Sequence, residues 1–174
     1  MRVGGATEYE YDTCGRIVSI KENNKLSTYQ YDKIGQLIRE NNKHLDKTFI
    51  YSYNEVGNIT SVKTYAYAEA GTTPTGSYTT KSYTYDGTNK DRLTNFNGTS
   101  ISYNTIGCPT KYQGKSLTWV KGKLTGMSSG TFATGTRSYS FAYNAQGQRV
   151  TSSYRFLEGT SLIANPNLNR IRFK

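Results

Sequence analysis

The stretch YEYDTCGRI at residues 9–17 decides the fold, because its pattern, aromatic-x-Tyr-Asp/Asn-x-x-Gly, recurs along the chain. Clear copies are YQYDKIGQL from residue 29, YSYNEVGNI from 51, ISYNTIGCP from 101 and FAYNAQGQR from 141. A looser copy, YTYDGTNKDRL, starts at residue 83, and a degenerate copy, LTWVKGKL, starts at 117. The chain therefore holds about seven units of roughly 20 residues, which is the signature of a repeat array.

Each unit has the pattern of one β-hairpin. Side chains alternate along a strand, so the two aromatic positions share one face and form an aromatic stripe, which we expect to be the buried face. The Asp or Asn then accepts a backbone N–H two residues on, and the Gly supplies the positive φ that closes a bulged turn. The predicted turn residues are Asp12, Gly15, Asp32, Gly35, Asn54, Gly57, Asn104, Gly107, Asn144 and Gly147.

The repeat predicts an all-β fold in which antiparallel hairpins join into an extended curved sheet. Leu, Ile, Val and Phe make up about 18% of the residues, just below the roughly 20% under which chains tend to be disordered. The 16 Tyr compensate, because their rings bury much surface while the hydroxyls stay wet. We expect one continuous array over residues 1–174, with exposed insertions at 64–82 and 126–138.

The net charge of +10 is concentrated in the second half of the chain. Residues 1–91 hold 11 Lys or Arg and 11 Asp or Glu, whereas residues 92–174 hold 11 and 1. Such asymmetry is typical of a protein with an anionic partner, and equally of a solvated basic face that resists self-association. The charge alone does not choose between them.

The rare residue types exclude several classes of site. One His, His44, and two distant Cys, Cys14 and Cys108, cannot form a soft-metal site, a haem pocket or a CxxC redox motif. We therefore expect no metal and no cofactor. The two Cys could pair across distant units, but unpaired small side chains fit their turn positions better. No apolar run approaches the roughly 18 residues of a membrane span, and residues 1–12 carry no signal-peptide segment.

The sequence favours a protein without catalytic activity. Asp12, Asp32 and Asp86 could act as paired carboxylates, but the turn role already explains each of them. His44 lies in the polar connection NNKHLDK, where a surface role fits better than that of a base. The chain has no GxSxG or Ser-x-x-Lys motif that would supply an activated nucleophile.

Basic and aromatic residues interleave in KYQGKSLTWVKGK, residues 111–123. This composition fits contact with a glycan, with an anionic wall polymer or with single-stranded nucleic acid. It also fits rings that pack the sheet while the Lys amines reach water, and the repeat itself favours this last interpretation. The candidate contact residues are Lys111, Lys115, Trp119, Lys121 and Lys123.

The repeat resembles the YD repeat of the RHS/YD-repeat family, whose signature is Tyr-x-Tyr-Asp-x-x-Gly-Arg-Leu/Ile. Residues 9–17 follow this signature position by position, and the second unit departs from it only at Gln36. Asn replaces Asp in three later units, and the unit near Tyr85 lacks Gly at the usual place. The resemblance covers nearly the whole chain and implies a segment of the YD-repeat region upstream of the RHS core.

This resemblance implies a structural role in a large secreted or cell-surface bacterial protein, such as a polymorphic toxin or a wall-associated protein. In that family, hairpins form a shell around a C-terminal toxin or effector. The implied partners are flanking repeats and that effector, and open sheet edges would permit edge-to-edge self-association. The alternative is a cell-wall or glycan-binding module that uses the aromatic stripe and the basic second half. Nucleic-acid binding ranks third.

Overall fold

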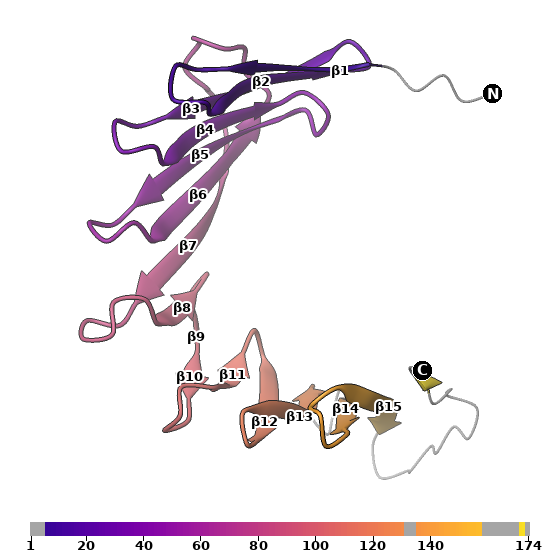
Figure 1. Ribbon diagram of the computed structural model, residues 1–174. Helices are drawn as coiled ribbons and strands as arrows, with labels where there is room; N and C mark the ends of the chain where they lie inside the picture. The colour runs from indigo at the N-terminus through magenta and orange to yellow at the C-terminus, as the bar shows by residue number, and fades with distance from the viewer. Residues whose placement is uncertain (1–5, 131–134, 158–170, 173–174) are drawn as a thin grey trace, which may run out of the picture. The chain divides into compact units, whose positions relative to one another are not determined.

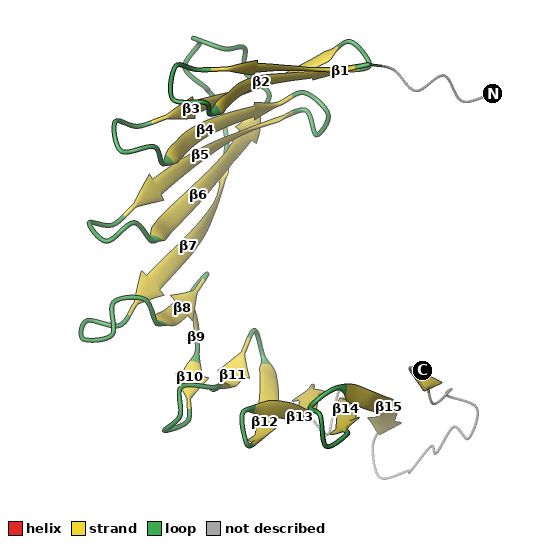
Figure 2. Ribbon diagram, in the orientation of Figure 1, coloured by secondary structure: helices red, strands yellow, loops and turns green. Residues whose placement is uncertain are grey.

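A computed structural model describes residues 6–130, 135–157 and 171–172 of the chain (Figure 1). All regular elements in these residues are β-strands that pair with antiparallel neighbours, and Figure 2 shows no helix among them. The prediction of an all-β array of antiparallel hairpins is confirmed. Among the same residues, no helix is long and apolar enough to cross a membrane.

Sixteen strands are assigned within the described residues and fall into two open sheets. The first sheet has the order β1 (Thr7–Tyr11), β2 (Ile17–Glu22), β3 (Lys25–Tyr31), β4 (Leu37–Asn42), β5 (Lys47–Tyr53), β6 (Ile59–Ala66), β7 (Thr79–Tyr85), β8 (Leu93–Phe96) and β9 (Thr99–Ser100). The second sheet has the order β10 (Ser102–Tyr103), β11 (Pro109–Tyr112), β12 (Lys115–Val120), β13 (Lys123–Ser129), β14 (Thr136–Tyr143), β15 (Arg149–Leu157) and β16 (Ile171–Arg172).

The chain divides into two compact units, residues 1–93 and 94–174, and each is described by itself. The single array over residues 1–174 stays a prediction. Of the insertion expected at 64–82, both ends belong to strands β6 and β7, so the connection itself is 67–78. Of the insertion at 126–138, the ends belong to β13 and β14, and residues 131–134 lie outside the described part.

In the first unit, the Asp/Asn-x-x-Gly turns at 12–15, 32–35 and 54–57 alternate with connections of other kinds. After the Asp/Asn-x-x-Gly turns the register shifts by one residue, as between β1 and β2, where Glu10 pairs with Ser19 but Tyr11 pairs with Ile17. Such an extra residue is a β-bulge and increases the local twist. The connection from β2 to β3 is instead a two-residue turn at Asn23 and Asn24, with φ of 49° and 61°. Positive φ at both central residues is what a type I′ hairpin turn requires.

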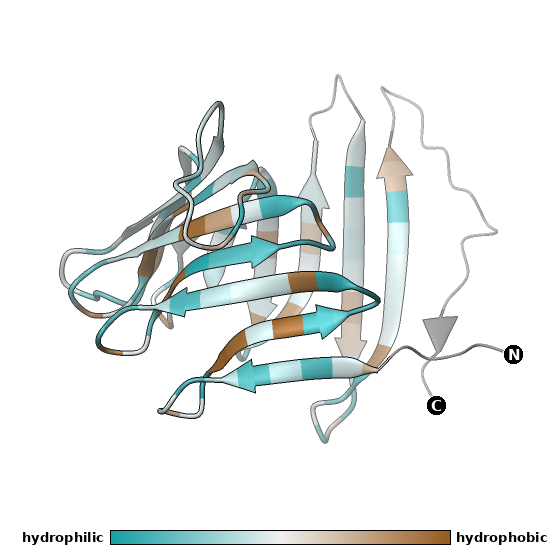
Figure 3. Ribbon diagram, turned by 90° about the horizontal axis from the view of Figure 1, so that it is seen from above, coloured by the Kyte–Doolittle hydropathy of each residue, from teal (hydrophilic) through white to brown (hydrophobic). Residues whose placement is uncertain are grey.

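The aromatic stripe is half-buried in the interior strands. Tyr29 and Tyr31 of β3, like Tyr51 and Tyr53 of β5, have intermediate exposure. Figure 3, coloured by hydropathy, shows short hydrophobic segments separated by hydrophilic ones along the strands. Burial and a hydrogen bond to Glu40, 3.0 Å from the Tyr51 hydroxyl, raise the pKa of that phenol. The tyrosine rings of this single-layer sheet therefore remain partly exposed to solvent.

The most buried side chains of the first unit are polar, and they lie on the face opposite the tyrosines. Asn41 and Thr48 are fully buried, pair across β4 and β5, and are joined by a 3.1 Å hydrogen bond. Asn41 also donates to the Thr28 hydroxyl at 2.8 Å. Arg39, 9% exposed, donates to Asn41 Oδ1 at 2.8 Å. This arrangement differs from the expectation that the aromatic stripe is the buried face.

The connection from β6 to β7 explains this burial. The Ala68 backbone N–H donates to the Thr48 hydroxyl at 2.9 Å, and the Glu69 carbonyl accepts from Arg39 at 3.1 Å. Tyr67 lies under the Lys43 ammonium, 4.0 Å from its ring centre. The start of the predicted insertion thus packs over the face that carries the polar cluster and closes it from water, whereas residues 69–73 are exposed.

Candidate functional site

The repeated turn is the first candidate site, and its Asp or Asn side chain organises it. In the first hairpin, Asp12 Oδ1 accepts the backbone N–H of Cys14 and of Arg16, both at 2.9 Å. The Gly15 N–H reaches the Asp12 carbonyl at 3.0 Å, and the Asp12 N–H reaches the Arg16 carbonyl at 2.9 Å. One side chain therefore satisfies two backbone donors that the bulged turn leaves free.

The same bonds recur where Asn replaces Asp. Asn54 Oδ1 accepts from Val56 at 3.2 Å and from Asn58 at 2.9 Å, and Asn104 Oδ1 accepts from the two matching positions of its own turn. Asp32 follows the same scheme, and Asn144 Oδ1 accepts from Gln148. An amide oxygen serves as well as a carboxylate here, so the turn needs an acceptor and does not need a charge.

The turn glycines all have positive φ. The values are 77° at Gly15, 89° at Gly35, 89° at Gly57, 82° at Gly107 and 85° at Gly147. Residues with a Cβ rarely adopt this conformation. At Gly57 an added Cβ would also lie 3.2 Å from Gln36 Nε2 of the preceding hairpin, a tight contact with the end of a flexible side chain.

The second aromatic of a unit bonds to the hairpin before it. The Tyr31 hydroxyl donates to the Ile17 carbonyl at 2.8 Å, and the Tyr53 hydroxyl donates to the Leu37 carbonyl at 2.7 Å. In each case the acceptor is the second residue after the turn glycine. The same contact recurs as Tyr85 to Ile59 at 2.9 Å, Tyr143 to Leu124 at 2.9 Å and, through its indole N–H, Trp119 to Pro109 at 2.6 Å. We call this series the aromatic ladder.

The strand register explains why these carbonyls need a side-chain donor. Backbone pairing of β2 with β3 begins at Ser19 opposite Thr28, two residues beyond Ile17. The strands therefore diverge before they reach the bulge, and the Ile17 carbonyl lies outside the ladder of backbone bonds. The other four acceptors lie outside the pairing in the same way, two residues before its first pair. The aromatic hydroxyl or indole replaces the missing backbone donor.

In two of the units, a cation directly after the turn glycine adds a second contact between hairpins. The Arg16 guanidinium lies 4.7 Å from the ring centre of Tyr31 and is bound by Asp12 at 2.7 Å. The backbone N–H of Arg16 and its guanidinium together hold the pKa of the Asp12 carboxyl below its ordinary value. Lys123 follows Gly122 and lies 5.6 Å from the ring centre of Tyr143. A cation above the ring supplements the hydroxyl bond.

The residues predicted to contact a glycan or anion do not form one cluster. Trp119 and Lys123 take part in the contacts between hairpins described above. Lys115 shares the face of Trp119 on β12, whereas Lys111 pairs with Ser116 and lies on the opposite face. Lys121 is exposed in a two-residue turn with φ of 49°.

The turn after Tyr85 is longer than the others and is held by an ion pair. Asp86 accepts the backbone N–H of Asn89 at 2.8 Å and of Thr88 at 2.9 Å, and the Arg92 guanidinium at 2.7 Å. These donors, with the Asn89 N–H first, lower the pKa of the Asp86 carboxyl to about 2. This turn lacks the glycine at its usual position, and the ion pair between Asp86 and Arg92 stabilises it instead.

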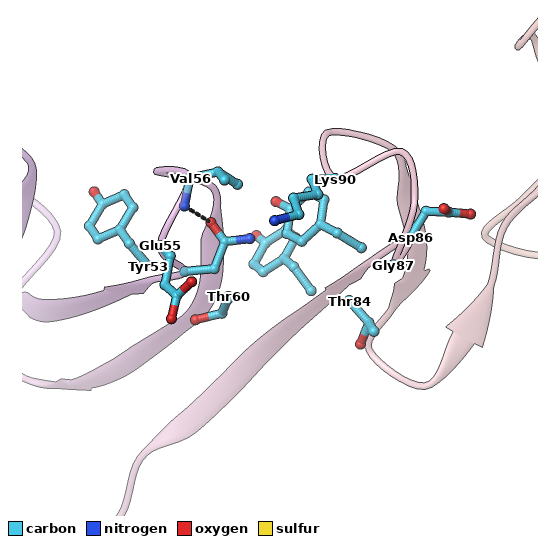
Figure 4. A pocket seen from close by; sticks show the side chains of 11 residues that line it. Tyr53, Glu55, Val56, Thr60, Thr84, Asp86, Gly87 and Lys90 are labelled. Atoms are coloured by element: carbon cyan, nitrogen blue, oxygen red, sulfur yellow. Dashed lines mark hydrogen bonds between the residues drawn. The ribbon is translucent and has the colours of Figure 1, made fainter.

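A pocket of about 540 Å³ lies between the turn at 54–57 and the turn at 86–92 (Figure 4). It combines the carboxylate of Glu55 and the amine of Lys90 with aromatic walls. These walls are the rings of Tyr53, Tyr83 and Tyr85. Its lining contains no Cys and no His.

The remaining reactive side chains stay apart. His44 Nε2 lies 3.6 Å from Glu22 at the surface, Cys14 is an exposed free thiol, and Cys108 is a half-buried one. Across the residues that the structure describes, no group of three or more His, Cys, Asp and Glu side chains is arranged to hold a metal ion.

Comparison with known proteins identifies a similar fold in much larger chains. No protein family and no curated protein matches the sequence. The crystal structure of TcdB2-TccC3-TEV is similar at 16% identity and a TM-score of 0.53, over 97% of this chain and 11% of that one. The structure of TcdB2-TccC3 without its hypervariable C-terminal region is similar at 13% identity, over 98% of this chain and 12% of that one, with a TM-score of 0.49. The first similarity shows a shared fold.

Sequence reasoning missed the acceptors of the aromatic ladder and the polar cluster around Asn41. The acceptors are backbone carbonyls, which have no residue type to recognise. One signal was available, because each acceptor stands two positions after a turn glycine. For the cluster, Arg39 and Asn41 stand two residues apart and so share one face of their strand, which is a weak signal of a polar surface that is covered. The residues that cover it, 67–69, lie outside the repeat.

We expect Tyr53→Phe to destabilise the protein by about 1 kcal/mol, because it removes only the hydroxyl and leaves the Leu37 carbonyl without its donor. The measurement is urea unfolding followed by circular dichroism. Tyr9→Phe is the matched control, since that hydroxyl belongs to an exposed ring on the outermost strand. An equal loss of stability in the two variants would show that the Tyr53 hydroxyl does not stabilise the contact between hairpins.

The protein should lose stability in acid as Asp86 is protonated. Its folded pKa, about 2, lies below the ordinary value of 3.8, so its contribution is complete above pH 4 and disappears as the pH falls toward 2. Asp86→Asn keeps an acceptor oxygen but no longer titrates, so its unfolding midpoint in urea should change less between pH 5 and pH 2. Asp91→Asn, a control on the same turn, should retain the wild-type slope. If the unfolding midpoint of Asp86→Asn changes with pH as much as that of the wild type, Asp86 is not the source of the acid sensitivity.

Proposed function

We propose that this chain is a non-catalytic segment of the wall of an RHS/YD-repeat protein, of the kind that encloses a C-terminal toxin or effector. The observation that carries the proposal is the aromatic ladder. Five units make the same bond to the hairpin before them, from an aromatic N–H or O–H to a carbonyl two residues after a turn glycine. A contact that repeats without change suits a wall that grows one hairpin at a time.

The fold similarity supports this proposal. The match to TcdB2-TccC3-TEV extends over 97% of this chain, so it involves the whole array and not one hairpin. This chain spans only 11% of the length of that protein. A role as one part of a larger assembly is therefore consistent with both the repeat and the size difference. Flanking repeats and the effector would be its partners, and the complete protein would act outside the cell.

The absence of a catalytic role is likewise proposed from the turn chemistry. The carboxylates that could act as acids or bases occupy turn positions, where each accepts two backbone N–H bonds. Asn54, Asn104 and Asn144 fill the same positions in other units and cannot transfer a proton at neutral pH. Because the amide preserves the turn bonds, the repeat has no need of the carboxyl chemistry.

The glycan-binding alternative receives less support from the residues that suggested it. The Trp119 indole N–H donates to Pro109, and the Lys123 amine lies over the Tyr143 ring. Both groups serve contacts between hairpins. Lys111 and Lys115 lie on opposite faces of their sheet. The set therefore offers no single surface on which a sugar chain could be bound.

The proposal predicts that the natural polypeptide carrying these repeats protects its effector from protease. The effector should be cut slowly while the ladder is intact. It should be cut several-fold faster in the double variant Tyr53→Phe and Tyr85→Phe, which removes two successive bonds between hairpins. The measurement is limited proteolysis with time-resolved mass spectrometry.

Tyr9→Phe is the control and should leave the rate of cutting unchanged. Rapid cutting of the effector in the unaltered protein would contradict the enclosing role. In a parallel arm, the 174-residue chain is titrated with wall teichoic acid and screened on glycan arrays at two salt concentrations. Saturable micromolar binding that survives high salt would overturn the proposal in favour of the glycan-binding alternative.

A further inference from the structure

The contact between Lys123 and Tyr143 differs in charge from the equivalent contact in the first hairpins. Arg16 lies 4.7 Å from the Tyr31 ring centre, and the Asp12 carboxylate binds it at 2.7 Å. Lys123 lies 5.6 Å from the Tyr143 ring centre, but residues 94–157 contain no Asp or Glu. Within the part of the chain that the structure describes, no carboxylate therefore balances the charge of Lys123.

A second cation, Arg149, lies beside the same ring. Its guanidinium carbon is 5.9 Å from the Tyr143 ring centre and 4.3 Å from the Phe141 ring centre. One of its N–H groups also donates to the Tyr143 hydroxyl at 3.4 Å. Arg149 stands two residues after its turn glycine, a place that an apolar residue holds in the first three hairpins, as Ile17, Leu37 and Ile59. An arginine has replaced the apolar residue here.

The turn beside these two cations has lost its carboxylate as well. Asn144 follows Tyr143 where Asp32 follows Tyr31. Asn144 Oδ1 accepts the Gln148 N–H at 2.9 Å, so the turn is kept without the charge. The Lys123 amine lies against this turn, 3.1 Å from the place of a Cβ added to Gly147. Two positive charges and no negative one thus lie at the turn end of the β14–β15 hairpin.

The charges of this site select a doubly negative ligand. Arg149 is exposed and Lys123 is half-buried, so both can be reached from solvent. The two cations repel each other, and an anion between or beside them would be attracted by both. A guanidinium pairs with two oxygens of a phosphate, and an ammonium adds a point charge. A phosphate group carries roughly two negative charges at neutral pH, whereas a carboxylate carries one.

We propose that Lys123 and Arg149 form a phosphate-binding site at the turn end of the β14–β15 hairpin. The rings of Tyr143 and Phe141 hold the two cations in place, and the ligand is a phosphate group, free or carried on a larger molecule. The inference goes beyond the proposed function and does not depend on it, because it concerns charges that the contact between hairpins does not require.

The test titrates the full chain with inorganic phosphate and follows nuclear magnetic resonance signals of the Gly147 and Gln148 amides and of Arg149 Nε. We expect saturable shifts at these groups. Arg149→Leu restores the residue type of Leu37, so it should fold normally but bind phosphate roughly 3- to 10-fold more weakly. Asn144→Asp should also weaken binding, because its carboxylate competes for the cations.

Arg155→Gln is the matched control. Arg155 is exposed and pairs with Ser138, on the face of the hairpin opposite Tyr143, so this variant loses the same charge elsewhere. It should bind phosphate as the original chain does. An equal loss in Arg155→Gln and Arg149→Leu would show that only the net charge acts and would overturn the proposal. So would the absence of saturable shifts, or acetate bound as tightly as phosphate.

A glycerol-phosphate oligomer separates the two sources of the ligand. Binding tighter than that of inorganic phosphate, and weakened in Arg149→Leu, would assign the site to phosphate carried on a polymer. Weaker or equal binding would assign it to a free phosphate group. Binding at this site should fall several-fold as salt is added. Only binding that survives high salt counts against the enclosing role, so the two proposals can fail separately.

Discussion

The hydrogen bond from the second aromatic of a unit to a carbonyl of the hairpin before it is the constraint on which the rest of the structure depends. Each bulged turn forces its strands to diverge from the next hairpin, and the divergence leaves one carbonyl outside the backbone ladder. A Tyr hydroxyl or a Trp indole spans the gap. The turn, the bulge and the aromatic are thus required together, which explains why they recur as one motif.

A single-layer sheet has few positions from which water is excluded, and this chain compensates with polar contacts. Asn41, Thr48 and Arg39 form a hydrogen-bonded cluster that the backbone of Ala68 and Glu69 completes. Fully bonded polar groups tolerate burial, because each lost bond to water is replaced. The tyrosines on the other face contribute ring area while their hydroxyls join neighbouring hairpins. Stability is therefore distributed along the array and not concentrated in one core.

The local structure could be predicted from sequence because its determinants are side chains at fixed spacing. Asp12 and Gly15 specify a turn, and the two aromatics before them specify a strand face. The repeat already placed Trp119 at the second aromatic position of a degenerate unit, but its bond could not be predicted, since the indole N–H reaches the Pro109 carbonyl and a carbonyl has no residue type to recognise. The packing of 67–69 over the polar cluster was also missed. A Gly/Thr/Pro-rich insertion indicates an exposed loop, and the bonds that hold this segment come mainly from backbone groups, which the sequence does not mark. Candidate ligand residues were chosen by composition, and composition does not distinguish the two faces of a strand.

The central claim is that one hydroxyl or indole contact joins successive hairpins, and proton exchange measured by nuclear magnetic resonance tests it most directly. The account predicts slowly exchanging hydroxyl protons on Tyr31, Tyr53, Tyr85 and Tyr143, and a slowly exchanging indole proton on Trp119, each close in space to the residue that accepts it. The hydroxyl protons of Tyr9 and Tyr11 should exchange with water too rapidly to be seen. Equally rapid exchange at all of these positions would contradict the account.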